Sequence, residues 1–261
     1  MGVVNATPDS FSDGGRAHTL EAATALGALL LAQGADILDV GGESTRPGAS
    51  PVSAEEELAR VLPVVTALAG PRPISIDTYK AAVADAALAA GASIVNDVSG
   101  GLLDPELLSV VARRGATVIL GHLRGTPATM NDEADYADVV AEVRDELDAR
   151  VHAAREAGIA KDKIWIDPGL GFSKRAEHSA RVLAHLDRYA ALGARIVVGA
   201  SRKSFLASLV GRGLPVDERE EATAAAHALA IWLGATVVRV HDVALQLPAI
   251  RAAEALRRLV A

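Results

Sequence analysis

The chain has 261 residues, of which half are hydrophobic and 3% aromatic; it carries a formal net charge of −7 and no cysteine. The negative charge argues against general affinity for nucleic acid or an anionic membrane surface, and the absence of cysteine excludes disulfides and thiolate metal sites. No apolar run approaches the roughly 20 residues that cross a bilayer, and no basic, apolar leader precedes the first strand. We therefore expect a cytoplasmic protein.

Short apolar, β-branched runs alternate with helix-like stretches along the chain. The predicted strands are GVVN, DILDVGGES, ISIDT, SIVNDVSG, TVILGHL, KIWIDPG, RIVVGAS and TVVRVHD, in that order. Runs that are apolar throughout are typical of strands buried on both faces of a parallel sheet. Between the strands, apolar residues at three- and four-residue spacing predict helices at 20–32, 54–68, 81–90, 139–157, 180–192, 223–233 and 243–259.

The ends of these helices carry matching signals. Ser53 stands before an acidic first turn, and a glycine follows the helical stretch in AQGAD, AAGAS, RRGAT, EAGIA and ALGAR. Eight strands alternating with helices, without a linker or composition break, most simply close into a single α/β domain, a (β/α)₈ TIM barrel over residues 1–261. The alternative is a doubly wound open sheet, but DPGLGFSK has Lys174 where the third glycine of the dinucleotide fingerprint belongs.

Polar or ionisable side chains end every predicted strand, and in a barrel these carboxyl ends meet at one rim. The side chains are Asn5, Asp39, Glu43, Asp77, Asn96, Asp97, His122, Asp167, Ser201, Arg202, Lys203, Arg239 and His241. Each one alone has a structural explanation as a helix cap or a satisfied core residue. Their occurrence at all the strand ends indicates a site.

The chemistry of these groups suggests two subsites. Carboxylates and an amide suit a planar heterocycle rich in N–H donors, and Lys203 suits a ring carbonyl or nitrogen. Arg239 and His241 are two residues apart on one strand, so they share a face and suit phosphate oxygens. The structural alternative for RVHD is a salt bridge from Arg239 to Asp242.

Familiar catalytic motifs are missing from the sequence. It has no H-E-x-x-H, no nucleophile elbow and no phosphate-binding G-x-x-x-x-G-K-[ST] loop. Ser44 and Ser201 have no neighbouring base in sequence, so a covalent mechanism has no obvious nucleophile. The remaining expectation is a heterocycle bound at depth and an anion at the mouth, with catalysis by positioning and electrostatics.

Seven ordered motifs, NATPDSFSDGG, DVGGESTRPGA, SIDT, NDVSGG, DPGLGF, GASRKSF and RVHDV, closely resemble those of the dihydropteroate synthase family. The resemblance covers essentially the whole chain and implies the same barrel. It implies a folate-biosynthesis transferase that condenses 6-hydroxymethyl-7,8-dihydropterin pyrophosphate with p-aminobenzoate, uses Mg²⁺ and releases pyrophosphate. It also implies a homodimer and a sulfonamide target.

The resemblance assigns roles to residues of this chain. It places the pterin on Asp77, Asn96, Asp167 and Lys203, the pyrophosphate on Asn5, Thr45, Arg46, Arg239 and His241, and p-aminobenzoate on Thr45, Pro47, Phe172 and Ser204. Asn5 would also lie near the metal, and the catalytic residues would be Lys203, Arg239, His241 and Arg46. The loops around TPDSF (Thr7, Pro8 and Phe11) and STRPG look like mobile lids. In the implied mechanism pyrophosphate leaves first, and the neutral arylamine attacks a cationic pterin methylene.

No departure from the family pattern touches the residues to which the resemblance assigns roles, but Gly121 replaces the methionine that commonly precedes the fifth-strand histidine. We expect this glycine to loosen one wall of the pterin pocket. Two alternative functions remain. A methyltetrahydrofolate-dependent methyltransferase would share the deep carboxylates but would not need TPDSFSDGG or SRKSF, and a catalytically idle pterin-binding paralogue would be expected to lose Lys203, Arg239 or STRPG.

Overall fold

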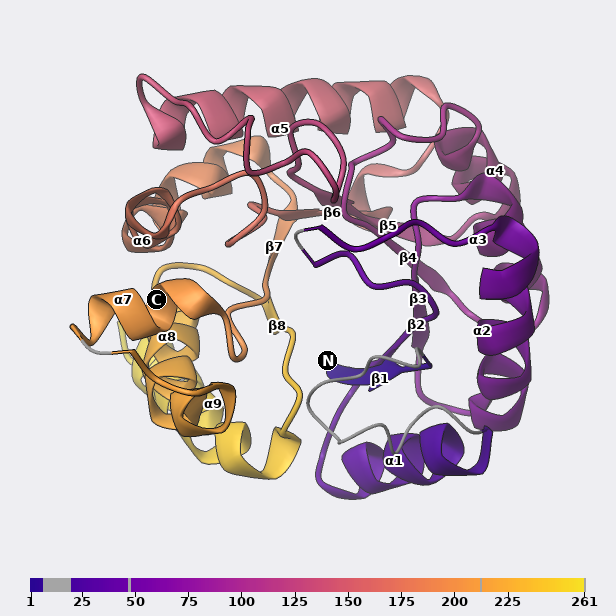
Figure 1. The fold of residues 1–261 in the computed structure, drawn as a ribbon, viewed down its shortest axis with the longest axis horizontal. Helices are drawn as coiled ribbons and strands as arrows, with labels where there is room; N and C mark the ends of the chain where they lie inside the picture. Colours follow the sequence, from indigo (N-terminus) through magenta and orange to yellow (C-terminus); the bar gives the residue numbers. More distant parts are fainter. Residues whose placement is uncertain (7–19, 47, 212, 261) are drawn as a thin grey trace.

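Parallel strands in the centre and helices around them form the chain's two layers, as Figure 1 shows for the computed structural model. The structure describes residues 1–6, 20–46, 48–211 and 213–260. Within these residues an eight-stranded parallel sheet runs in chain order from β1 to β8. Its strands are β1 (Gly2–Asn5), β2 (Leu38–Gly41), β3 (Ile74–Asp77), β4 (Ile94–Asp97), β5 (Thr117–Gly121), β6 (Ile164–Asp167), β7 (Arg195–Val198) and β8 (Val237–Val238).

Backbone contacts join the last strand to the first. Gly2 forms a parallel bridge with Val240, just after β8, and the Val3 N–H donates to the Val240 carbonyl at 3.0 Å. The (β/α)₈ barrel expected from the sequence is therefore confirmed.

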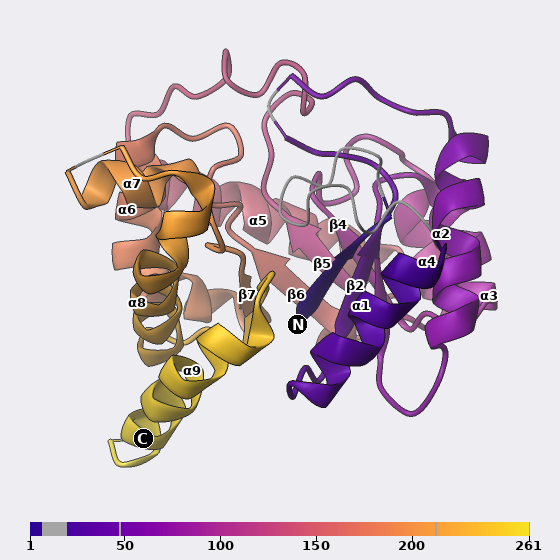
Figure 2. The ribbon, with the colours of Figure 1, turned by 60° about the horizontal axis from the view of Figure 1, so that its bottom comes forward.

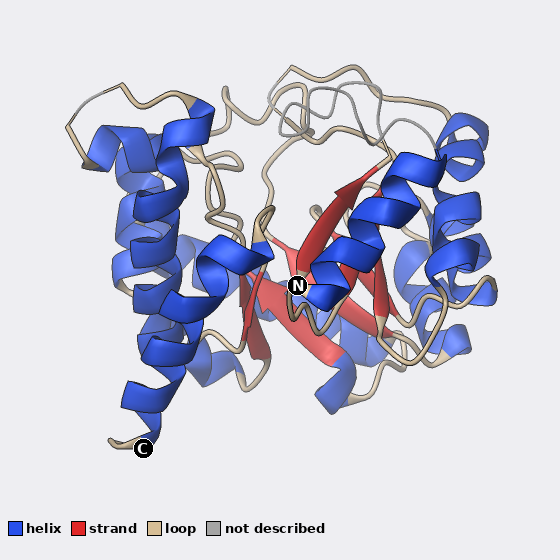
Figure 3. Cartoon of the chain, turned by 90° about the horizontal axis from the view of Figure 1, so that it is seen from below, coloured by secondary structure: helices blue, strands red, loops and turns tan. Residues whose placement is uncertain are grey.

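Helices cover the outside of the sheet, and the loops that follow the strands gather at one end of it (Figures 2 and 3). The α-helices are α1 (Leu20–Ala32), α2 (Ala54–Leu68), α3 (Ala81–Ala89), α4 (Leu107–Arg114), α5 (Val139–Glu156), α6 (Ala176–Ala184), α7 (Ser204–Leu209), α8 (Glu220–Trp232) and α9 (Val243–Arg258). Short 3₁₀ segments lie at η2 (Lys161–Lys163), η3 (Leu186–Leu192) and η4 (Val216–Arg219). No helix in the described ranges is long and apolar enough to cross a membrane.

Two kinds of local prediction can be compared with these bounds. Ser53 caps α2 by accepting the Glu56 N–H at 3.2 Å, and Gly115 ends α4 in the left-handed conformation, as the signals indicated. The single helix expected at 180–192 is wrong, because α6 ends at Ala184 and η3 follows. Leu186 and Tyr189 are fully buried at three-residue spacing, which suits the eclipsed i, i+3 positions of a 3₁₀ segment.

An apolar plug fills the interior of the barrel. Ile37, Ile94, Ile119, Trp165 and Val197 form a buried cluster separate from the main core, which lies between the sheet and the helices. The plug residues lie two positions before Asp39, Asn96, Gly121, Asp167 and Gly199, so these later residues face the same side of the sheet, farther toward the carboxyl ends of the strands. This arrangement places the candidate site at the rim where the strand-end residues gather.

Candidate functional site

A cavity opens at the carboxyl rim of the barrel. It is lined by Thr45, Asp77, Asn96, Val98, Gly121, His122, Asp167, Gly169, Phe172, Gly199, Ser201, Lys203, Arg239 and His241. The predicted site residues Thr45, Asp77, Asn96, Asp167, Phe172, Lys203, Arg239 and His241 are thus brought together around one cavity. Among the described residues, Asn5, Arg46 and Ser204 do not line it. Pro47, Thr7, Pro8 and Phe11 lie outside the described residues.

Strand alternation separates the two polar residues that end β4. Asn96 lines the cavity, whereas Asp97 is fully buried and turns to the other side of the strand. Its carboxylate accepts the Ser99 N–H at 2.8 Å, the Ser99 hydroxyl at 2.7 Å and the Gly101 N–H at 2.5 Å. Asp97 therefore holds the loop after β4, and Asn96 is the residue available to a ligand.

Arg239 is held by two carboxylates from other parts of the sheet. Its Nε donates to Asp39 Oδ2 at 2.5 Å, and a terminal nitrogen donates to Asp77 Oδ2 at 2.7 Å. Because the segment after β8 and strand β3 are not neighbours in the sheet, the second contact crosses the mouth of the barrel. The alternative partner Asp242 is wrong, since its carboxylate caps α9 by accepting the Leu245 N–H at 3.0 Å.

Burial shifts the pKa values of the charged groups in the cavity. It raises the pKa of Asp77, and the neighbouring Arg239 opposes that change. Burial also raises the pKa of Asp167, which is opposed by Lys203 and by the Gly169 N–H that the carboxylate accepts at 2.8 Å. Carboxylates whose ionised form is disfavoured by burial bind cationic or N–H-rich ligands with a gain in free energy, because such ligands stabilise the charge.

Lys203 enters the cavity from the loop after β7. Its Nζ donates to the Leu170 carbonyl and lies 4.5 Å from the centroid of the Phe172 ring. Burial lowers the pKa of Lys203 to about 8, and Asp167 opposes the shift. The side chain is therefore mainly a cation at neutral pH, placed near the Asp167 carboxylate and against the Phe172 ring.

The structure also pairs Ser201 with His241, a contact that the sequence analysis did not find. Ser201 Oγ lies 2.9 Å from His241 Nδ1 and accepts the backbone N–H of His241 at 3.2 Å. Burial lowers the pKa of His241 to about 3, with further lowering by Arg239 and other nearby cations. The imidazole is thus neutral, and when the serine hydroxyl donates to Nδ1, the ring carries its proton on Nε2 as a donor. The two residues are 40 apart in sequence, and they meet because β7 pairs with β8, which brings the segments after these strands together.

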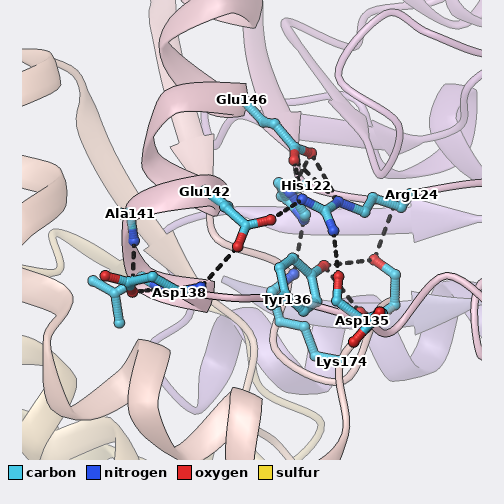
Figure 4. A network of polar contacts seen from close by, with 11 residues as sticks. His122, Arg124, Asp135, Tyr136, Asp138, Ala141, Glu142, Glu146 and Lys174 are labelled. Atoms are coloured by element: carbon cyan, nitrogen blue, oxygen red, sulfur yellow. Dashed lines mark hydrogen bonds and ion pairs between the residues drawn. The ribbon is translucent and has the colours of Figure 1, made fainter.

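A network of polar contacts braces the wall of the cavity formed by His122 (Figure 4). His122 Nε2 lies 3.0 Å from Glu146 on α5, and Nδ1 lies 2.8 Å from Lys174 Nζ. Arg124 donates to Glu146 and, at 2.8 Å, to Glu142. Burial lowers the pKa of His122 to about 4. With both ring nitrogens engaged, His122 is a fixed wall of the cavity.

Lys174 ties this network to the loop after β6. Its buried Nζ also donates to the Phe172 carbonyl at 3.1 Å, and burial lowers its pKa well below the usual range. The sequence analysis considered Lys174 only as a replacement for a glycine. A lysine within a loop gives no sign that its amine will be buried.

Gly121 closes the cavity wall instead of loosening it. A Cβ at this position would lie 2.7 Å from both Cα and the carbonyl oxygen of Val98 and 2.8 Å from the Asp97 carbonyl oxygen. The backbone after β4 therefore occupies the space beside Gly121. The loose wall that we expected from the missing methionine is wrong for this structure.

We predict that Gly121→Ala lowers the free energy of unfolding by about 1–3 kcal/mol, because the added methyl group meets backbone that must shift. Urea denaturation measures the effect. Gly213→Ala is the control, since Gly213 is exposed and a Cβ there meets nothing within 4 Å. Equal stability of the Gly121→Ala variant and the parent chain would contradict the close approach of the Val98 backbone.

A larger cavity of about 590 Å³ lies at the opposite, amino end of the barrel. Its walls are mainly apolar side chains, including Met1, Ile37, Trp165 and Val237. Among the described residues, the amino-end cavity holds one titratable group with a shifted pKa, the Met1 amine. Six such groups line the cavity at the carboxyl rim: Asp77, His122, Asp167, Lys203, Arg239 and His241. Such convergence marks functional sites, and barrel enzymes carry their chemistry at that end.

A parallel barrel with buried carboxylates, an amide and two cations at its carboxyl rim has the features of an enzyme that binds a polar heterocycle. The family model described as "Pterin binding enzyme" matches residues 1–241, and the chain belongs to this family. Individual relatives also match this chain over most of their own length. A dihydropteroate synthase of Synechocystis is 45% identical over 260 residues, covering 99% of this chain and 90% of the relative.

Solved structures of similar proteins agree in fold. Xanthomonas albilineans dihydropteroate synthase with 4-aminobenzoic acid has a TM-score of 0.90 at 47% identity, covering 98% of this chain and 92% of the other. The same enzyme in complex with 7,8-dihydropteroate has a TM-score of 0.87 at 44% identity, with 98% and 92% coverage. Yersinia pestis dihydropteroate synthase in a sulfonamide drug complex has a TM-score of 0.94 at 40% identity, with 99% and 94% coverage.

Proposed function

We propose that the chain is a transferase of folate biosynthesis with dihydropteroate synthase activity. It would join the methylene of 6-hydroxymethyl-7,8-dihydropterin pyrophosphate to the amine of p-aminobenzoate and release pyrophosphate. The observation that carries the proposal is the convergence of Asp77, Asn96, Asp167 and Lys203 on one cavity whose rim also presents Arg239 and His241. Relatives with this activity match nearly the whole chain.

The deep end of the cavity suits the pterin. Asp77 and Asp167 accept N–H donors of the heterocycle, and Lys203 donates to a ring carbonyl or nitrogen. A hydrogen bond to a charged group contributes about 1.5–3 kcal/mol, so the two carboxylates discriminate against rings that lack donors. Phe172, against which Lys203 is packed, is placed to contact the arylamine, together with Thr45, Pro47 and Ser204.

The mouth of the cavity suits the departing pyrophosphate. Arg239 supplies a guanidinium fork, and neutral His241 supplies its Nε2–H, while Thr45, Arg46 and Asn5 complete the set that we propose for the anion. Because the arylamine is neutral and a modest nucleophile, stabilising the leaving charge is the main task of these groups. The carboxylates of Asp77 and Asp167 favour positive charge on the pterin as pyrophosphate departs.

The residues present fit a magnesium ion that the substrate holds in part. Among the described residues no group of three or more His, Asp or Glu side chains could hold a metal. Mg²⁺ keeps several waters and is usually bound by few protein groups together with substrate phosphates, so the amide oxygen of Asn5, at the carboxyl end of β1, would be the protein's ligand to the ion. When bound, the ion would neutralise charge on the pyrophosphate.

Two rival functions remain to be separated by experiment. A methyltetrahydrofolate-dependent methyltransferase would use the same deep carboxylates, but the chain also carries TPDSFSDGG and SRKSF. A catalytically idle paralogue would bind pterin without turnover, yet Lys203, Arg239 and the STRPG loop are all present. Both facts favour the synthase.

We predict that pyrophosphate is released only when the pterin pyrophosphate and p-aminobenzoate are both present, and that chelating Mg²⁺ reduces the rate. A coupled pyrophosphate assay measures the release. Binding of the pterin without release under any condition would instead support the idle paralogue.

The pKa of Lys203 predicts how activity depends on pH. The ammonium exists below about pH 8 and the neutral amine above it, so kcat/KM for the pterin pyrophosphate should fall as pH rises through that value. Lys203→Met should lower kcat/KM at pH 7 by roughly 10–150-fold and remove the alkaline decline. An alkaline decline with the same midpoint in Lys203→Met would assign it to another group.

We also propose a homodimer formed through the face of α7 and α8. Leu229 and Trp232 are exposed three residues apart on α8, so they share a face of that helix, and Leu209 is exposed at the end of α7. Exposed apolar side chains that gather on one face mark interaction surfaces. Trp232→Glu should convert the dimer to a monomer in light-scattering chromatography. Leu29→Glu, which changes an exposed side chain of α1, should leave the dimer intact. A dimer that persists in Trp232→Glu would place the interface elsewhere.

The cytoplasmic location expected from the sequence stays a prediction.

A further inference from the structure

Asp39 is a fully buried carboxylate in β2 that the proposed function leaves without a role. It does not line the cavity among the described residues, yet both of its side-chain contacts are to residues that do. Oδ2 accepts from Arg239 Nε at 2.5 Å and from Asn96 Nδ2 at 3.2 Å. We propose that Asp39 is a positioning residue that sets the direction of the Asn96 amide and anchors Arg239 while its other partner is exchanged. The proposal rests on the proposed function.

The effect on Asn96 follows from hydrogen-bond chemistry. An ionised carboxylate only accepts hydrogen bonds, so Asn96 must turn its NH₂ group toward Asp39. The amide oxygen is then the atom that Asn96 can offer to the cavity. A free asparagine could present either end to a ligand, and contact with Asp39 makes it an acceptor for the N–H groups of a heterocycle.

The effect on Arg239 follows from the different positions of its two carboxylates. Asp77 lines the cavity, so N–H donors of an incoming ligand compete with Arg239 for its oxygens. Asp39 is fully buried and is not among the residues that line the cavity, so a ligand there does not compete for its oxygens. Ligand binding therefore releases one terminal nitrogen of Arg239 from Asp77 while Nε stays on Asp39, and the freed nitrogen becomes available to an anion at the mouth.

A purely structural ion pair explains Asp39 less well. Asp39 Oδ1 is buried without a hydrogen-bond partner among the described residues, and so is Ser75 Oγ, which stands opposite it in the register of β2 and β3. Buried polar atoms are normally satisfied, and burying an ion pair contributes little net stability. Because Asp39 adds little to stability, its role is better explained by the orientation that it gives to Asn96 and Arg239.

The test compares Asp39→Asn with the parent chain by calorimetric binding of two probes, 6-hydroxymethylpterin and inorganic pyrophosphate. Asparagine keeps the shape but not the charge, and it can accept or donate, so Asn96 is no longer held in one direction. We expect the affinity for each probe to fall by about tenfold or more, and kcat/KM to fall with it.

Glu57→Gln is the matched control. Glu57 is also fully buried, also has one unpartnered oxygen, Oε1, among the described residues, and is paired with Lys80 at 2.6 Å. The loss of its charge should lower the melting temperature and leave both affinities unchanged. Unchanged affinities in Asp39→Asn, or equal losses of affinity in the two variants, would overturn the positioning role.

A crystal structure of the parent chain with 6-hydroxymethylpterin gives a second test that needs no variant. Arg239 should have left Asp77 while Nε remains within hydrogen-bond distance of Asp39, and departure from Asp39 would overturn the proposal. The proposed function would fail on a different result. In that case the parent chain would bind both probes but show no turnover.

Discussion

The ion pairs of Arg239 with Asp39 and Asp77 are the interaction on which the rim of the barrel depends. Burying several carboxylates close together is unfavourable, because each loses hydration and repels the others. Asp39, Asp77 and Asp167 share the interior with the two cations Arg239 and Lys203. Arg239 and Lys203 oppose the effect of burial on Asp77 and Asp167 and so favour the ionised form of each carboxylate.

Closure of the barrel makes this arrangement possible. Arg239 and Asp39 are 200 residues apart, and they meet because the backbone of Val240 pairs with β1, which neighbours β2. Below them lies the apolar plug around Trp165, which surrounds the charged groups with apolar side chains on that side. The same plug lowers the local dielectric, so the contacts of Arg239 are stronger than they would be in water.

The sequence predicted the fold and the location of the site because both follow from repetition. Apolar strands recur with a polar residue at each carboxyl end, and a parallel barrel collects those ends whatever their partners are. The contacts between them were less predictable. Asp39 and Asp77 as partners of Arg239, and Ser201 as partner of His241, depend on how side chains cross between strands, which no local pattern encodes.

The hydrophobic pattern of the sequence also could not predict short helices or close backbone contacts. Helix α7 has six residues and α4 has eight, which is too short for periodicity to identify them reliably. At Gly121 the resemblance to the family predicted a gap, because it compares side chains and not backbone. The structure fills that space with Val98, so a missing side chain in a motif is compensated by a closer approach of the main chain.

The double use of Asp77, as a partner of Arg239 and as a proposed ligand of the heterocycle, gives the site an order of events. While Arg239 occupies Asp77, the anion site lacks one of its donors and the heterocycle site lacks one of its acceptors. A heterocycle that takes Asp77 completes both at once, provided that Asp39 keeps the guanidinium in place. In the proposed reaction, the groups that would stabilise a departing pyrophosphate are then assembled only around a bound pterin. Binding energy from the ring is thereby used at the reacting bond, where it raises the rate.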